Sequence, residues 1–404
     1  MDAFYASVEL LRYPELRGEP VVIGGGSRHK PEESVDPETG RMVRRFAKLA
    51  DYVGRGVATT ATYEARAFGV HSAMGLMKAA RLAPQAFLLP TDFAIYGQYS
   101  RRFKNAVRAI APQVEESGID EIYIDLTDVG LAPGASIADE ASDAARDRAA
   151  RVGRAIKDAV RAETGLGCSI GVTPNKLLSK IASELDKPDG LTVVFEDEVP
   201  ARVWPLPARK INGVGPKTAA RLEALGIVTI GQLAQAEPAW LIERFGKSAG
   251  AWMHAAANGR DGRPVVTQSE PVSVSRETTF ERDLSAERDR AELSAIFTEL
   301  CSDLAGDLQR KGYVGRTIGV KVRYGNFKTL TRDRTIPEPT QDAAAIRRAA
   351  GECLKRVPLE RRIRLLGVRV SGLCRCDEAT PCVPVAAEPR GDATPSLFGE
   401  RGPE

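Results

Sequence analysis

The sequence lacks any apolar run approaching the roughly 20 residues that a membrane-spanning helix needs. Its N-terminal end also lacks a basic stretch followed by an apolar one, the pattern of a secretory signal. These absences argue against a membrane-embedded or exported protein. We therefore expect a cytoplasmic protein with no membrane partner.

Cysteine is scarce, with six residues in a chain of 404. Cys374, Cys376 and Cys382 hint at a metal-binding spacing, but no fourth ligand lies near them in the sequence. A zinc site is the alternative interpretation, and free thiols in a reducing compartment fit the pattern better.

Charge is unevenly distributed along the chain. Apolar residues make up 43% and charged residues 27%, as in an ordinary globular protein, and the formal net charge is only +3. Residues 264–375 contain 21 Lys and Arg against 15 Asp and Glu, whereas the remainder contains 36 against 39. A basic C-terminal part suits a polyanion such as nucleic acid, with a solvated Arg-rich surface as the alternative.

The pattern of elements predicts a multidomain α+β protein. Up to about residue 200, short β-type runs alternate with helical stretches, which favours a mixed sheet covered by helices on one face. A polar stretch at about 27–56 is typical of a surface insertion between two strands. Residues 201–260 are helical, and residues 264–375 follow the order βαββαβ. The tail at 376–404, rich in Pro, Ala and charge, is expected to be disordered.

The stretch "GIDEIYIDLT" places Asp120 and Glu121 at the start of an alternating strand, within a predicted hairpin. Adjacent carboxylates at a turn can both reach one cation, and oxygen-only ligands suit Mg²⁺. A solvent-facing acidic turn is the alternative interpretation. Nearby, Tyr63 and Arg66 share one face of a helix if "TATYEARAFGV" is helical, and with Lys180 they could hold a triphosphate.

The stretch "INGVGPKTAARLEALGI" predicts two helices joined by a tight turn. Gly213 and Gly215 would present backbone N–H groups and a helix N-terminus to a phosphate, with Lys217 beside them. This helix-hairpin-helix pattern holds a DNA backbone without reading bases. A plain helical turn is the alternative.

In this order, "DAFYASVE", "TATYEARAFGV", "SAM", "IDEIYIDLT", "CSIGVTPNKLLSKIASELDKPDG" and "INGVGPKTAARLEALGI" resemble the Y-family translesion DNA polymerases, in the DNA polymerase IV branch. The resemblance covers residues 1–375. It implies a right-hand polymerase, with a ferredoxin-like palm and small fingers in 1–200, a helix-hairpin-helix thumb in 201–260 and a βαββαβ little finger in 264–375.

The resemblance also implies roles for individual residues. Asp120 and Glu121 would bind two Mg²⁺ ions and act in catalysis, and Tyr5 would be the steric gate that excludes ribonucleotides. The incoming nucleotide would contact Phe4, Tyr63, Arg66 and Lys180, and the DNA would contact Gly213, Gly215 and Lys217. The implied partners are primer-template DNA and deoxynucleoside triphosphates, bound by a monomer. "TPSLFGE" resembles a short peptide that binds the sliding clamp, through Leu397 and Phe398.

One departure from the family pattern concerns the first metal ligand. The family has Asp-x-Asp before the aromatic pair, whereas here Met1 is at the middle position and Asp2 at the second. We therefore expect that the native chain starts upstream and that the first palm strand and its aspartate are missing from this sequence. Two alternatives to an active polymerase are a catalytically inactive DNA-binding paralogue and a helix-hairpin-helix nuclease or repair scaffold.

Overall fold

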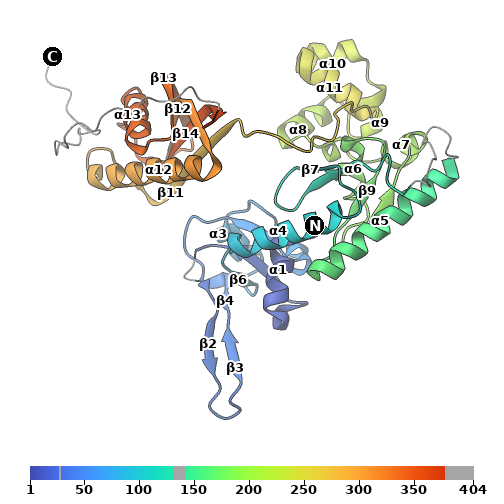
Figure 1. The fold of residues 1–404 in the computed structure, drawn as a ribbon, viewed down its shortest axis with the longest axis horizontal. Coiled ribbons are helices and arrows are strands. Elements are labelled where there is room, and N and C mark those ends of the chain that lie inside the picture. The colour runs from blue at the N-terminus through green and yellow to red at the C-terminus, as the bar shows by residue number, and fades with distance from the viewer. Residues whose placement is uncertain (27–28, 131–141, 378–404) are drawn as a thin grey trace. The chain divides into compact units, whose positions relative to one another are not determined.

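The structure, a computed structural model, describes residues 1–26, 29–130 and 142–377. It divides into two units, Met1–Gln268 and Ser269–Glu404, which are drawn in Figure 1. Within the described residues, no helix is both long and apolar enough to cross a membrane. The five described cysteines are free thiols, and Cys168, Cys301 and Cys353 are buried.

The fingers part of the first unit is built on a four-stranded sheet. Its strands, in spatial order, are β4 (Ala47–Lys48), β6 (Phe87–Leu89), β1 (Val21–Gly24) and β5 (Ala58–Ala61). Strand β1 is buried throughout, which explains its continuous apolar run. Helices α2 (Tyr63–Ala67) and α3 (Leu76–Leu82) pack against this sheet and share its core.

The predicted surface insertion contains a second structural element. Strands β2 (Glu32–Val35) and β3 (Met42–Arg45) form a two-stranded antiparallel hairpin, which projects from the fingers in Figure 1. The side chain of Arg44 pairs with Glu33 on the neighbouring strand at 2.9 Å and with Glu15 at 3.2 Å. The insertion is therefore an ordered arm rather than a plain loop.

The palm strands form two separate sheets, not the single mixed sheet that the sequence predicts. Strand β7 (Val114–Glu116) pairs with β8 (Ile122–Ile124), and β9 (Ile170–Val172) pairs with β10 (Leu191–Val193). Residues of β8 and β9 both line one cavity of about 740 Å³. No strand in the described ranges joins the two sheets across this cavity.

Three helices position the palm strands and the first residues of the chain. Helices α4 (Phe93–Arg108) and α5 (Ser142–Thr164) enclose a core that includes Phe103, Val107 and Ile156. Helix α1 (Phe4–Arg12) packs on a second core with Tyr96 and Leu166. Phe4 is buried in that core.

The rest of the first unit is helical. Helices α8 (Pro216–Ala224), α9 (Ile230–Gln235), α10 (Pro238–Phe245) and α11 (Lys247–Ala257) are held by a shared core. Helix α6 (Lys176–Ala182) of the palm contributes Leu177, Leu178 and Ile181 to the same core. The palm and the helical part therefore form one packed unit, which fixes the helical hairpin relative to the acidic turn.

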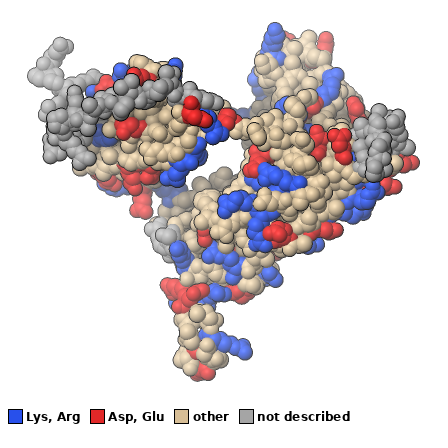
Figure 2. All heavy atoms as spheres, viewed as in Figure 1, with Lys and Arg blue, Asp and Glu red and all other residues tan. Residues whose placement is uncertain are grey.

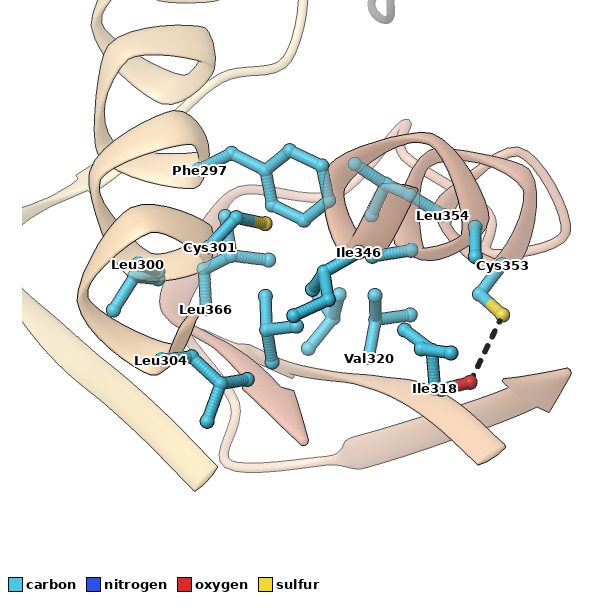
Figure 3. Close-up of a cluster of buried hydrophobic side chains, with 14 of the residues drawn as sticks. Phe297, Leu300, Cys301, Leu304, Ile318, Val320, Ile346, Cys353, Leu354 and Leu366 are labelled. Atoms are coloured by element: carbon cyan, nitrogen blue, oxygen red, sulfur yellow. Dashed lines mark hydrogen bonds between the residues drawn. The ribbon is translucent and has the colours of Figure 1, made fainter. Parts of the chain in front are cut away.

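The second unit has the predicted order βαββαβ. Its elements are β11 (Ser273–Leu284), α12 (Arg290–Lys311), β12 (Tyr313–Tyr324), β13 (Thr329–Thr340), α13 (Ala343–Leu354) and β14 (Ile363–Arg375). The sheet order is β11-β14-β12-β13, with antiparallel neighbours. Both helices pack on one face of the sheet, where Phe297, Ile346 and Val320 meet, as Figure 3 shows. The thiol of Cys353 donates to the carbonyl of Ile318 at 3.6 Å within this core.

Candidate active site and DNA-binding elements

The acidic pair lies in the turn between β7 and β8. The amides of Ser117 and Gly118 both donate to the carbonyl of Glu121, at 3.1 Å each. The buried ammonium of Lys104 donates to the Gly118 carbonyl at 2.8 Å and to Glu116 at 2.7 Å. These contacts anchor the backbone of the turn to α4.

A polar cavity of about 240 Å³ opens in front of this turn. Its lining includes six of the residues that the sequence singles out: Phe4, Tyr5, Tyr63, Arg66, Asp120 and Glu121. The remaining lining residues are Met1, Ala3, Thr59, Thr60, Ser72 and Lys187. Segments far apart in the sequence therefore meet around one space whose lining includes both carboxylates and cations.

Tyr5 lies in the first turn of α1, at one wall of the cavity. Burial, followed by the charge of Asp120, raises the pKa of Tyr5. Ala3, the residue that precedes α1, has the left-handed angles φ 43° and ψ 44°, which cost energy for a residue other than glycine. The N-terminal end of the helix lies at the cavity, where its free N–H groups and dipole favour an anion.

Tyr63 and Arg66 are set by the start of α2. The Thr62 side chain caps this helix by accepting from the Ala65 amide. The guanidinium of Arg66 lies over the Tyr63 ring at 4.9 Å from its centroid and donates from Nε to the Ala61 carbonyl at 3.1 Å. The Tyr63 hydroxyl is buried, and within the described part of the chain it has no hydrogen-bond partner. A buried hydroxyl without a hydrogen-bond partner costs free energy, so the Tyr63 hydroxyl is a donor that a bound ligand could satisfy.

Lys180 does not line the cavity that holds Tyr63 and Arg66. Its ammonium forms an ion pair with the Glu121 carboxylate instead. Burial favours the neutral form of Lys180, but the bond and the charge of Glu121 dominate and raise its pKa. The structure therefore places Lys180 beside Glu121 and outside the lining of this cavity, and its predicted contact with a triphosphate stays a prediction.

Lys187 is the cation that the sequence reasoning missed. It lines the polar cavity together with Arg66, and its ammonium lies 2.5 Å from Glu184. The signal was present in "LDKPDG", where a Lys-Pro-Asp-Gly turn follows helix α6 and precedes β10. A turn of this kind reverses the direction of the chain and can bring a side chain back to a binding site, but the sequence of the turn does not indicate which site.

Asp2 is buried and supports the loop that carries Lys187. Its carboxylate accepts from the Ser169 hydroxyl at 2.9 Å and from the Asp189 amide at 2.8 Å. It is therefore directed at protein donors and holds the 186–190 loop against the start of α1.

Replacing Asp2 should destabilise the chain. We expect Asp2→Ala to lower the free energy of unfolding by about 1–3 kcal/mol, since two buried donors lose their acceptor. Urea unfolding monitored by circular dichroism measures this loss. Asp51→Ala, at an exposed carboxylate, is the matched control and should change stability by less than about 0.5 kcal/mol. Equal effects of the two substitutions would contradict the supporting role of Asp2.

The predicted helical hairpin consists of a three-residue 3-10 turn (Ala208–Lys210), the glycine-containing turn and helix α8, and its phosphate contact stays a prediction. Gly213 has φ +108°, and a Cβ there would lie 2.7 Å from the Trp252 ring, so only glycine fits. Gly215 is the N-cap of the nine-residue helix α8, with Pro216 in its first turn. Lys217 follows and is exposed.

The predicted clamp-binding residues, Leu397 and Phe398, lie outside the described residues.

The carboxylates at the acidic turn can supply some, but not all, of the ligands of a Mg²⁺ ion. Among the described residues, no group of three or more His, Cys, Asp and Glu side chains converges as a metal site. Asp120 and Glu121 are two hard oxygen donors at the edge of the cavity. Mg²⁺ characteristically takes one or two carboxylates and completes its shell with substrate phosphates and water, so the pair suits it when phosphates are bound.

Comparisons with known proteins bear on this site. Residues 1–184 match the impB/mucB/samB family, residues 271–381 match the C-terminal domain of that family, and residues 196–227 match the IMS family HHH motif. The chain is 39% identical over 373 residues to a DNA polymerase IV of Methanoculleus marisnigri, covering 92% of each chain. It is also 39% identical to a DNA polymerase IV of Streptomyces coelicolor, covering 92% of this chain and 70% of the relative.

Solved structures agree on the fold. A chimeric Y-family DNA polymerase matches with a TM-score of 0.72 at 24% identity, covering 92% of this chain and 96% of the other. A structure titled as an insertion ternary complex of a DNA polymerase matches with a TM-score of 0.60 at 23% identity. At these identities the match concerns the fold alone.

The polar cavity, the acidic turn and the helical hairpin all lie within a fold that this chain shares with solved Y-family DNA polymerases. Its relatives then make the assignment specific. The chain belongs to the Y family of DNA polymerases, in the DNA polymerase IV branch, and is a DNA-directed DNA polymerase of the low-fidelity, translesion type. None of these findings supports the inactive-paralogue alternative.

Proposed function

We propose that the polar cavity binds the triphosphate and sugar of an incoming deoxynucleoside triphosphate, and that Asp120 and Glu121 act where it reacts. The unpartnered Tyr63 hydroxyl carries this proposal, because it is a buried donor beside the cations Arg66 and Lys187. Phosphate oxygens would satisfy it and would pair with both cations. The N-terminal end of α1 adds N–H groups to the same anion.

In this proposal the primer 3′-hydroxyl attacks the α-phosphorus, a new phosphodiester bond forms, and pyrophosphate leaves. Mg²⁺, as two ions held by Asp120, Glu121 and phosphate oxygens, would neutralise the charge that develops on the attacking and leaving oxygens. Tyr63, Arg66 and Lys187 orient the triphosphate. Tyr5 forms the wall beneath the sugar, where its ring leaves no space for a 2′-hydroxyl.

Lys180 pairs with Glu121, and its predicted contact with the triphosphate stays a prediction. Its ion pair neutralises part of the charge on Glu121, one of two adjacent carboxylates at the cavity edge. Like charges at close range repel, and a cation beside them offsets that repulsion. We infer that Lys180 holds the Glu121 side chain in position until nucleotide and Mg²⁺ arrive.

Primer extension tests the proposed function. A labelled primer annealed to a longer template, with Mg²⁺ and all four deoxynucleotides, should be lengthened one nucleotide at a time, and EDTA should abolish the reaction. Templates that carry an abasic site should also be copied past the lesion. Shortened strands would instead indicate a nuclease, and DNA binding with no change in strand length would indicate a DNA-binding paralogue.

Two surfaces are proposed to hold the primer-template duplex. The first is the helical hairpin with Gly213, Gly215 and Lys217. The second is the sheet face of the second unit opposite its helices, where Lys321, Arg323 and Arg369 lie among small residues. Figure 2 shows both signs of charge on the visible face of this unit. Arg369 pairs with Asp333 and Lys321 pairs with Glu277, so part of the positive charge on this sheet face is offset within the protein.

DNA affinity should fall steeply with salt. Each phosphate contact contributes a slope of roughly −0.9 to the plot of log K against log salt concentration. We expect Lys217→Ala to reduce the magnitude of that slope by about one and to weaken binding equally for all sequences. Fluorescence anisotropy between about 50 and 200 mM salt measures both values. Lys78→Ala, on the exposed side of α3 in the fingers, is the control; an equal loss of slope there would refute the thumb contact.

The C-terminal tail is proposed to bind the sliding clamp through Leu397 and Phe398, an apolar anchor pair in a polar segment. The enzyme itself is proposed to be a monomer. Replacing both anchors with alanine should remove stimulation by the clamp without changing synthesis in its absence. Stimulation that survives the double substitution would assign the clamp contact to another segment. The monomeric state is tested separately, by light scattering on the free chain, which should give a mass near 43.6 kDa.

A further inference from the structure

The proposed sugar wall, Tyr5, rests on a second aromatic ring. The Tyr5 ring stacks on that of Tyr96, with centroids 4.4 Å apart and an interplanar angle of 27°. Phe93, one helical turn before Tyr96 on α4, meets the Tyr5 ring edge-on at 5.8 Å and 87°. Tyr5 is only partly buried. One side of its ring is thus available to the cavity, and the position of the other side is set by α4.

Tyr96 is in turn held by a buried carboxylate. Its side chain is fully buried, and its hydroxyl donates to Oε1 of Glu9 at 2.6 Å. Glu9 is only 1% exposed, and its second oxygen lies 3.2 Å from the guanidinium of Arg12. Burial and the bond to Glu9 raise the pKa of Tyr96, so the hydroxyl keeps the proton that it donates.

Tyr5 and Glu9 hold Tyr96 from the same helix. They are four residues apart on α1, and residues at this spacing lie on one face of a helix. One stacks on the Tyr96 ring and the other binds its hydroxyl, so the ring is attached to α1 at two points. Two attachments fix both the depth and the tilt of the ring, whereas stacking alone would leave it free to slide.

This arrangement matters because a steric gate works by overlap. A wall that moves away from the sugar by a fraction of an ångström admits a larger group, and core side chains shift when a hydrogen bond or a methylene is removed. Loss of the Tyr96–Glu9 bond would let the ring behind Tyr5 relax, and Tyr5 would follow it. A deoxynucleotide would still fit, while a ribonucleotide would be rejected less well.

We propose that Glu9, acting through the hydroxyl of Tyr96, positions Tyr5 and so sets how strongly the polymerase prefers deoxyribonucleotides over ribonucleotides. Neither Glu9 nor Tyr96 lines the polar cavity, so both are positioning residues. The inference rests on the proposed function, in which Tyr5 faces the sugar.

The test is the ratio of kcat/KM for dATP to that for ATP, measured by single-nucleotide insertion with the full chain. Tyr96→Phe keeps the stack and removes the hydroxyl, and Glu9→Leu removes the acceptor. Each should lower the ratio by about tenfold, the size of effect that one buried hydrogen bond produces. Glu9→Gln keeps an acceptor at the same reach and should retain the ratio within about twofold.

Controls separate positioning from a general loss of structure. The double variant Glu9→Leu/Tyr96→Phe should be no worse than either single variant, because both remove the same bond. Tyr99→Phe, one turn further along α4 with its ring against Arg102, should leave the ratio unchanged. Insertion of dATP should stay within a few-fold of wild type in Tyr96→Phe, so that the change lies in selectivity.

Two results would overturn the proposal in different ways. An unchanged ratio in Tyr96→Phe and Glu9→Leu, alongside a lowered ratio in Tyr5→Ala, would show that the gate needs no support from Glu9. An unchanged ratio in Tyr5→Ala itself would show that Tyr5 does not face the sugar, and the proposed function would fail at that point. If Glu9→Leu does not fold, Tyr96→Phe alone decides the matter.

Discussion

Replacing Glu121 with glutamine, or Asp120 with asparagine, should lower the rate of nucleotide insertion by about a thousandfold or more. The amides keep the size and shape of the two side chains but remove the negative charge that, in the proposed function, holds Mg²⁺ at the reacting phosphate. Electrostatic stabilisation by a bound metal supplies several kcal/mol, and each 1.36 kcal/mol corresponds to about tenfold in rate. Rapid-quench measurement of single-turnover insertion gives the loss directly.

DNA affinity distinguishes this effect from a loss of folding. Both amide variants should bind primer-template DNA as tightly as the wild type, since the turn lies apart from the helical hairpin in the sequence and is held by Lys104 and backbone contacts. Asp125→Asn is the matched control, because Asp125 lies on the same segment and its carboxylate accepts from the Thr127 amide. An insertion rate that survives in both Asp120→Asn and Glu121→Gln would place the chemistry elsewhere.

Replacing Tyr5 with alanine should have the second largest effect, on sugar selectivity. Removal of the ring opens the wall beside the sugar, so the preference for deoxyribonucleotides should fall by about 100-fold or more, because a site without steric overlap rejects an added hydroxyl only weakly. Insertion of deoxynucleotides should change much less. The measurement is kcat/KM for a matched deoxynucleotide and ribonucleotide pair opposite the same template base.

A conservative variant sharpens this prediction. Tyr5→Phe keeps the ring stacked on Tyr96 and should retain the selectivity of the wild type. If Tyr5→Phe and Tyr5→Ala lose selectivity equally, the hydroxyl rather than the ring would be the discriminating group. The pKa of Tyr5 is raised by burial and by the charge of Asp120, so a neutral hydroxyl is expected over the whole working pH range.

Much of the fold can be predicted from local sequence patterns. The βαββαβ order follows from long amphipathic segments and a Gly325-Asn326 turn, and the structure confirms it. The acidic turn and the helical hairpin are also local, since adjacent carboxylates and a Gly-x-Gly spacing define them within a few residues. Short motifs of this kind can be predicted from the sequence because their geometry depends on the backbone conformation of a few neighbouring residues.

The parts that the sequence did not predict depend on contacts between distant segments. Lys180 and Lys187 are both lysines near α6, and only tertiary structure shows that the first pairs with Glu121 and the second reaches the cavity of Arg66. The division of the palm into two small sheets likewise depends on which strands become neighbours. The Tyr96–Glu9 contact joins positions 87 residues apart, and no periodicity in the sequence marks such a pair.

The central claim is that the polar cavity holds the nucleotide where it reacts, with its triphosphate at Tyr63, Arg66 and Lys187. The most direct measurement is a crystal structure of the chain with a dideoxy-terminated primer, its template, a matched deoxynucleotide and Mn²⁺, read by anomalous scattering. The account predicts Mn²⁺ on the carboxylates of Asp120 and Glu121 and triphosphate oxygens within hydrogen-bond distance of the Tyr63 hydroxyl. Nucleotide bound elsewhere, or a Tyr63 hydroxyl still without an acceptor, would contradict it.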